Sequence, residues 1–154
     1  FEGRIRCSGR GSLIFKGIME NQDIRWKQRY EHYVGALYQM KNAFNIKKQR
    51  AFTELELQGA VQAFEVTQEL SWKVMKDFLE AEGKTNLFGS KTVYREAFNL
   101  GIITNGELWL NTIESRNKTS HIYDEAEILE ILELIYNEYL PIFIDFENFM
   151  KTYL

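Results

Sequence analysis

The 154-residue chain contains a single proline, Pro141. Proline breaks a helix interior because it lacks a backbone N–H and its ring clashes with the preceding turn. A chain almost free of proline, and rich in leucine, glutamate and lysine, is therefore typical of an all-helical protein. From Ile24 onward, apolar side chains recur at steps of three and four residues, which predicts an amphipathic first helix. Its apolar stripe comprises Trp26, Tyr30, Val34, Leu37, Met40 and Phe44.

Two further helices are marked by capping signals. Thr53 and Glu56 have the spacing of a capping box, so we expect a second helix to begin there. Asp124 and Glu127 repeat this spacing, with aspartate as the cap, and predict the start of a long last helix. Pro141 lies inside that last helix and should kink or split it.

Glycines mark where helices end. Gly83 is expected to end the second helix, and Gly101 to stop a short helix over residues 90–100. A fourth helix is expected at roughly 105–115. Together these signals predict an all-α fold, an antiparallel helical bundle of about five helices.

Residues 1–18 differ from the rest of the chain. They hold four of the ten glycines and four basic residues against one acidic residue. We therefore expect residues 1–18 to be a vector-derived or otherwise foreign leader, and residues 19–154 to form a single domain.

Composition excludes several classes of function. The net charge of −3 provides no global basic field for binding nucleic acid. Cys7 is the only cysteine, which excludes an intrachain disulfide and fits a cytoplasmic protein. With two histidines besides, a zinc site is not expected. No apolar run reaches the length of a membrane span, because glutamates interrupt the most apolar segment, residues 128–139.

The expected second helix is apolar on two sides, which predicts a central position in the bundle or at a subunit interface. The last helix adds further apolar residues, and together they exceed what we expect one bundle of this size to bury. A two-fold homodimer is therefore expected. The residues of the last helix concerned are Ile131, Ile135, Tyr139, Phe143 and Phe146.

Residues 116–123 place a guanidinium, an imidazole and a phenol within one short segment. His121 could serve as general base or general acid on a ribose 2′-hydroxyl, and Arg116 could stabilise the extra charge on a phosphate. Asn, Thr and Ser between them favour turns, which would let Arg116, His121 and Tyr123 converge at one concave site near a dimer seam. The alternative is a plain helix connector with a paired arginine and an exposed histidine.

A second set of polar side chains shares one face of the second helix. These residues could line a substrate groove, or they could simply be a glutamate–lysine ladder on a solvated face. They are Glu65, Glu69, Trp72, Lys73 and Lys76.

A nucleotidyl-transfer site is not expected in this chain. Gly89-Ser90 could open such a motif, but the residues that follow, 91–95, contain none of the aspartates needed to hold magnesium. The chain therefore cannot bind catalytic metal in that manner.

Five segments follow one another between residue 24 and about residue 150: IRWKQRYEHY, QAFEVTQELSWKVMKDFLEAEG, VYREAFNLGII, GELWLNTIESRNKTSHIYDE and YLPIF. In combination they resemble the nucleotidyltransferase substrate-binding protein family. The resemblance implies a bundle like the C-terminal helical domain of kanamycin nucleotidyltransferase. It also implies a homodimer that pairs with a separately encoded minimal nucleotidyltransferase. That partner would hold the metal and the nucleotide, so no cofactor is expected in this chain. The substrate-binding residues would be Glu65, Glu69, Trp72, Lys73 and Asn117.

The resemblance extends to the wider HEPN group. The ribonuclease motif of this group is an arginine, four residues of any type, a histidine, one further residue and a tyrosine. Arg116, His121 and Tyr123 have this spacing. In related toxin–antitoxin pairs, the helical partner is a metal-independent ribonuclease toxin that the nucleotidyltransferase silences by adding AMP to the motif tyrosine, here Tyr123. Two hypotheses follow. The favoured one is a substrate-binding partner subunit. The alternative is an endoribonuclease toxin acting on RNA through Arg116 and His121.

Self-association is the first testable prediction. Sedimentation of the purified chain at micromolar concentration should show a dimer, because of the apolar surface expected on the second and last helices. A single species at the 18.2 kDa mass of the monomer would contradict this.

Overall fold

A computed structural model describes the backbone from residue 13 to residue 154 and the side chains from residue 23 onward. Over this range the chain consists of helices and loops without a strand, which confirms the all-α prediction. Residues 1–12, most of the expected leader, lie outside the described residues, and the leader stays a prediction. The elements are α1 (Leu13–Gln49), α2 (Glu54–Ala81), α3 (Gly89–Asn99), α4 (Gly106–Thr119), α5 (Glu125–Leu134), the π-helical turn η1 (Ile135–Tyr139) and α6 (Leu140–Lys151).

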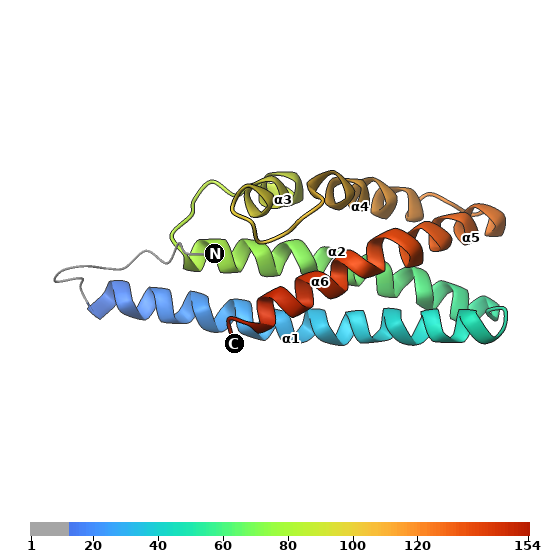
Figure 1. Ribbon diagram of the computed structural model, residues 1–154, viewed down its shortest axis with the longest axis horizontal. Helices are drawn as coiled ribbons and strands as arrows, with labels where there is room; N and C mark the ends of the chain where they lie inside the picture. Colours follow the sequence, from blue (N-terminus) through green and yellow to red (C-terminus); the bar gives the residue numbers. More distant parts are fainter. Residues whose placement is uncertain (1–12) are drawn as a thin grey trace.

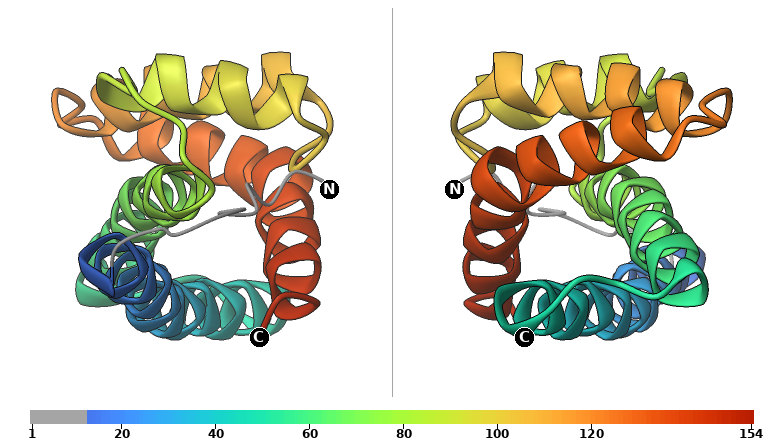
Figure 2. Two further views of the ribbon diagram at one scale, coloured as in Figure 1. Left: turned by 90° about the vertical axis from the view of Figure 1, so that its left-hand side faces the viewer. Right: turned by 90° about the vertical axis from the view of Figure 1, so that its right-hand side faces the viewer.

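Helices α1 and α2 form a long antiparallel hairpin (Figure 1). The pair α3 and α4 lies along one side of α2, and the α5–α6 segment crosses the hairpin diagonally. Seen along the long axis, the helices enclose a central core, with α6 on the side opposite α2 (Figure 2). The α1–α2 and α4–α5 loops lie at the same end of the molecule (Figure 1).

The core is rich in aromatic side chains. Trp26 and Trp109 are fully buried, as expected for packing residues, whereas Trp72 is only half-buried. Trp109 of α4 contacts Tyr94 of α3, with 5.2 Å between ring centroids, and Phe143 of α6 at 5.4 Å. Aromatic contacts of this kind connect three helices that are distant in sequence.

The dimer prediction assumed that the apolar residues of the last helix exceed what one bundle can bury, and for most of them this assumption was wrong. Ile135, Tyr139, Phe143 and Phe146 are at most 2% exposed within the single chain. The reason is the path of the chain from α5 through η1 to α6, which crosses the α1–α2 hairpin (Figure 1), and these side chains are part of the core of the single chain. On α2, Val66 remains 41% exposed. Self-association stays a prediction, but the apolar residues of the last helix that are buried within the chain no longer support it.

Pro141 splits the last helix, as predicted. Helix α5 ends at Leu134 and α6 begins with Pro141 in its first turn. Between them, the N–H of Leu140 donates to the carbonyl of Ile135, the wider hydrogen-bond spacing of a π-turn. Proline lacks an N–H, so the regular ladder cannot pass through residue 141.

Local signals located most helix ends. Gly83 and Gly101 follow α2 and α3 with positive φ angles of 92° and 77°, a backbone conformation that glycine adopts without strain. Asp124 caps α5 by accepting from the N–H of Ala126 at 3.1 Å. Helix α4, however, continues past the expected residue 115 to Thr119. The hydroxyl of Thr119 donates to the carbonyl of Arg116 at 2.8 Å, a local bond that a helical backbone accommodates.

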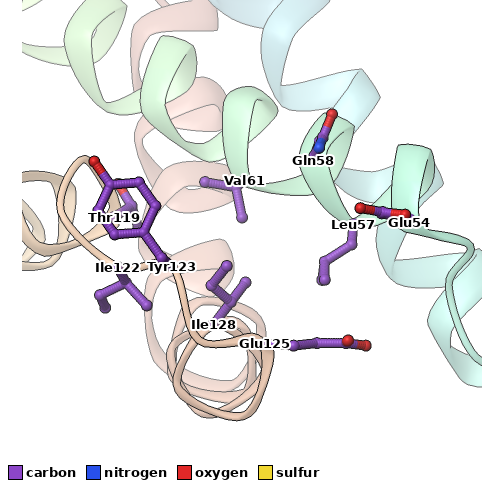
Figure 3. A pocket seen from close by; sticks show the side chains of 9 residues that line it. All are labelled: Glu54, Leu57, Gln58, Val61, Thr119, Ile122, Tyr123, Glu125 and Ile128. Atoms are coloured by element: carbon purple, nitrogen blue, oxygen red, sulfur yellow. The ribbon is translucent and has the colours of Figure 1, made fainter.

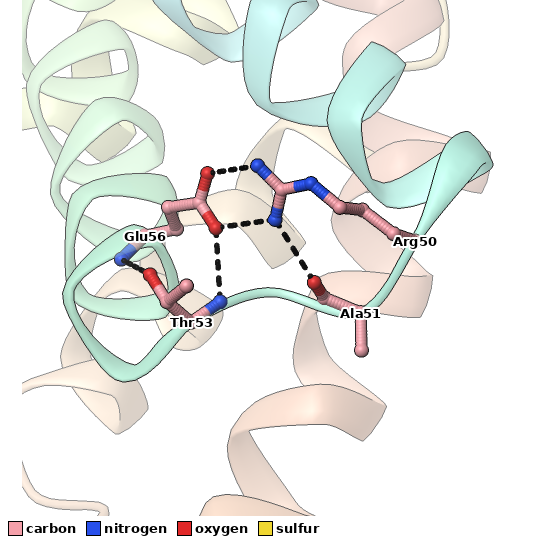
Figure 4. Close-up of polar contacts among 4 residues, drawn as sticks. All are labelled: Arg50, Ala51, Thr53 and Glu56. Carbon is pink, nitrogen blue, oxygen red and sulfur yellow. Dashed lines mark hydrogen bonds and ion pairs between the residues drawn. The ribbon is translucent and has the colours of Figure 1, made fainter.

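The start of α2 has both halves of the predicted capping box. The N–H of Glu56 donates to Thr53 Oγ1 at 3.1 Å, and the N–H of Thr53 donates to Glu56 Oε1 at 2.9 Å. Arg50 adds two hydrogen bonds to the same carboxylate, at 2.7 and 2.8 Å (Figure 4). The Arg50 guanidinium and then the Thr53 backbone bond lower the pKa of Glu56 to about 2.

The lowered pKa of Glu56 predicts a pH-dependent contribution to stability. The ionised carboxylate stabilises the fold above its unfolded pKa of 4.5, and this contribution is lost as the pH falls toward 2. Glu56→Gln should therefore lower the melting temperature at pH 7. The difference from the unmodified chain should shrink between pH 4.5 and 2.

The exposed Glu31, on α1, provides the control. Glu31→Gln should leave the melting temperature nearly unchanged over the same range. A destabilisation by Glu56→Gln that is the same at pH 7 and pH 2 would contradict the prediction.

Candidate functional site

The segment that carries the sequence motif lies at the junction of α4 and α5. Arg116 occupies the last turn of α4, which ends at Thr119. The N–H of His121 donates to the carbonyl of Lys118 at 2.9 Å and closes a turn. His121 and Tyr123 therefore belong to the loop before α5, whereas Arg116 belongs to the helix.

Arg116 reaches across to α2. Its Nη1 donates to Glu65 Oε2 at 2.9 Å and to Ser120 Oγ at 2.9 Å. Thr119 Oγ1 lies 2.9 Å from the same Glu65 Oε2 and 2.8 Å from the carbonyl oxygen of Arg116, so its single proton is shared between these two acceptors. The ion pair is partly shielded from water, because the Arg116 and Glu65 side chains are 34% and 22% exposed. The Nε of Arg116 is buried and has no hydrogen-bond acceptor within the described residues.

His121 and Tyr123 face solvent. The Tyr123 side chain is 94% exposed, and the imidazole of His121 is exposed as well. Among the described residues, no hydrogen bond links Arg116 to His121. The structure thus brings Arg116, Glu65 and Thr119 into contact. Convergence of Arg116, His121 and Tyr123 on one site stays a prediction.

A groove of about 470 Å³ lies between α2 and the start of α5. Tyr123 stands at one end beside Thr119, while Glu54 of α2 and Glu125 of α5 lie at the other end (Figure 3). Apolar side chains lie between these ends, so the groove combines an apolar lining with two carboxylates at one end. The apolar residues are Leu57, Val61, Ile122 and Ile128.

A second hollow of about 450 Å³ continues the groove past the α1–α2 loop and shares Leu57 and Glu125 with it. Its two cations are already paired: Lys47 contacts Glu133 at 3.1 Å, and Arg50 contacts Glu56. Glu54, Glu125 and Glu130 make no ion pair within the described part of the chain. The surface along the groove is consequently acidic.

The polar face of α2 expected to bind substrate lies outside this groove. Glu69 accepts from Trp72 Nε1 at 3.2 Å and pairs with Lys73 Nζ at 3.1 Å, so these three residues contact one another along α2. Asn117 is exposed on α4. The structure links only Glu65 of this set to Arg116. Substrate binding by the five residues stays a prediction.

Sequence reasoning missed several residues of the site. Ser120 accepts from the Arg116 guanidinium and Thr119 contacts Glu65, although the only sequence signal of both residues was their preference for turns. Glu54 and Glu125 of the groove carried no signal, and Leu57 was visible only as part of the apolar face of the second helix, because the groove forms only when α2 and α5 meet. From residue 23 onward, no group of three or more His, Cys, Asp or Glu side chains is placed to hold a metal ion.

Comparisons with known proteins agree with the resemblance drawn from the sequence motifs. The family model described as "Nucleotidyltransferase substrate binding protein like" matches residues 28–152. A curated relative from Haemophilus influenzae, named "Probable ribonuclease HepT", is 35% identical over 77 residues. That alignment covers 47% of this chain and 53% of the relative, so the chain spans about half the length of that protein. Within the described residues, no helix has the length and apolarity required to cross a membrane.

The exposure of Tyr123 predicts its chemical reactivity. Tetranitromethane attacks accessible phenolates, so brief treatment should modify Tyr123 and the 59% exposed Tyr38. Tyr94 and Tyr139 should resist, because both are buried and burial raises their pKa values, that of Tyr94 to about 12. Peptide mass mapping measures the order of modification. Nitration of Tyr94 or Tyr139 before Tyr123 would contradict the described burial.

Proposed function

This chain belongs to the nucleotidyltransferase substrate binding protein family, and we propose that it cleaves RNA in the cytoplasm without a metal ion, using Arg116 and His121. The observation that carries the proposal is the α4–α5 junction. There the Glu65 carboxylate holds Arg116 in a fixed orientation. His121 follows five positions later, and its imidazole is exposed and makes no hydrogen bond within the described residues.

Two observations favour RNA cleavage over the substrate-binding role that the sequence motifs favoured. The curated relative carries the name of a ribonuclease. In addition, Glu69, Trp72 and Lys73 contact one another along α2, as expected for a solvated face.

The proposed reaction needs only groups of this chain and solvent. Neutral His121 takes the proton of a ribose 2′-hydroxyl, and the 2′ oxygen attacks the adjacent phosphorus. The bond from phosphorus to the 5′ oxygen breaks, and that oxygen takes a proton from solvent. Arg116 stabilises the additional negative charge on the phosphate oxygens. The products are a 2′,3′-cyclic phosphate and a 5′-hydroxyl.

The groove beside Tyr123 favours a second candidate function, that of partner to a separately encoded minimal nucleotidyltransferase. Such a partner would hold the metal and ATP. The Tyr123 hydroxyl would attack the α-phosphorus of ATP and lose its proton to solvent, the bond to the β-phosphate would break, pyrophosphate would leave, and AMP would remain on Tyr123. The exposed phenol and the adjoining groove support this role, since an acceptor must enter another protein's active site. The two functions are compatible if the modification silences RNA cleavage.

RNA cleavage gives the fourth prediction. The purified chain should cleave single-stranded RNA in the presence of EDTA and leave 2′,3′-cyclic phosphate ends. His121→Ala should lower the rate by about 10² to 10⁴, because it removes the general base. Arg116→Ala should lower it by about 10² to 10³, because it removes stabilisation of the phosphate charge. Denaturing gel electrophoresis measures both rates.

The control is His32→Ala, at an exposed position of α1, which should cleave like the unmodified chain. Absence of cleavage by the unmodified chain, or full activity of His121→Ala, would contradict the ribonuclease proposal. The second candidate has its own test, intact mass after incubation with ATP and the minimal nucleotidyltransferase encoded in the same genome. One AMP should be added to the unmodified chain and none to Tyr123→Phe.

A further inference from the structure

We infer that Glu65 is a positioning residue of the ribonuclease site, which sets the orientation of the Arg116 guanidinium and the end of α4. This inference rests on the proposed RNA cleavage. It assigns Glu65 a role different from the substrate binding expected from the sequence.

The geometry concentrates two contacts on one oxygen. Glu65 Oε2 accepts from Arg116 Nη1 at 2.9 Å and lies 2.9 Å from Thr119 Oγ1, which shares its single proton with the carbonyl oxygen of Arg116. Both donors belong to the last turn of α4, directly before the loop that carries His121. One carboxylate of α2 therefore fixes the arginine and the helix end together.

The same contacts decide which donors of Arg116 remain for a phosphate. Nη1 has two N–H groups, and they point to Glu65 and Ser120. Nη2 makes no hydrogen bond to the described residues, and the buried Nε has no acceptor there. Because Nε is buried, Nη2 is the nitrogen that these contacts leave to donate to a phosphate, and a hydrogen bond between a guanidinium and a phosphate is charge-assisted and therefore strong.

The charge of Glu65 argues against direct contact with RNA. Its carboxylate would repel a phosphodiester, and its Oε2 is already occupied by two donors. An arginine held in place before the substrate arrives, however, needs less reorganisation in the transition state. Glu65 should therefore weaken RNA binding slightly while it accelerates the chemical step.

These opposing effects make the inference testable. With the full chain and a single-stranded RNA oligonucleotide, Glu65→Ala should lower kcat by about 100-fold, the order expected from a misplaced catalytic group. Its KM should stay equal or fall. Glu65→Gln keeps an acceptor oxygen of the same reach without the charge, so its kcat should fall by only about 10-fold. A purely structural loss would not combine a lower kcat with unchanged or tighter substrate binding.

A double-mutant cycle tests whether Glu65 acts through Arg116. Adding Glu65→Ala to Arg116→Ala should cause no further loss of kcat, because the group that Glu65 positions is already absent. The matched control is Glu147→Gln, which removes another interhelical ion pair, the 3.4 Å contact with Lys41 of α1. This control should leave kcat and KM unchanged.

The outcomes separate the inference from the function on which it rests. If the unmodified chain cleaves RNA and Glu65→Ala has the same kcat, the inference alone is overturned. Additive losses in the double variant would also overturn it, because Glu65 would then act independently of Arg116. If Glu65→Ala does not fold, the kcat and KM of Glu65→Gln decide. If the unmodified chain does not cleave RNA, the ribonuclease proposal fails and this inference fails with it.

Discussion

The aromatic inner face of α6 is the contact on which the rest of the bundle depends. Phe143 and Phe146 pack against Trp109 of α4, with ring centroids 5.4 and 5.8 Å apart, and Phe146 also contacts Tyr33 of α1 at 5.4 Å. Each buried ring contributes about 1.5–3 kcal/mol. The Tyr33 hydroxyl donates to the carbonyl of Phe143 at 2.6 Å, which fixes the register of α6 on α1. Burial accordingly raises the pKa of Tyr33 well above its usual value.

This core extends to the candidate site through Tyr139 in the π-turn. Its ring stacks on Phe64 of α2 at 5.8 Å, and its hydroxyl lies 2.7 Å from Ser115 Oγ of α4. Glu65 directly follows Phe64 on α2, and Arg116 directly follows Ser115 on α4. The turn imposed near Pro141 thus helps to place the two helices so that the ion pair can form between them.

Charge divides the surface around the α4–α5 junction into two parts. The groove and the hollow that continues it are lined by three carboxylates that make no ion pair with the described residues, Glu54, Glu125 and Glu130. Such a surface repels nucleic acid and favours cationic or protein partners. On the α2 side, Glu65 neutralises most of the field of Arg116 until a phosphate comes close. An acidic chain is therefore compatible with RNA cleavage only if binding relies on a few local contacts rather than on long-range attraction.

The helical fold and most helix boundaries could be predicted from the sequence, because their causes are local. Thr53 and Glu56 cap α2 across three residues, Gly83 and Gly101 adopt positive φ angles, and Pro141 interrupts the hydrogen-bond ladder of its own helix. The motif at residues 116–123 was also visible, because its chemistry depends on residue type and spacing alone.

Only the tertiary structure decided which of these residues meet. Glu65 and Arg116 are separated by 51 positions, and no local signal relates them. The groove exists only because α5 folds back over α2. The aromatic residues of the last helix looked like excess apolar surface in the sequence, yet the path of α6 buries them inside a single chain. The reason is that periodicity shows which face of a helix is apolar, whereas the packing of distant helices determines what covers that face.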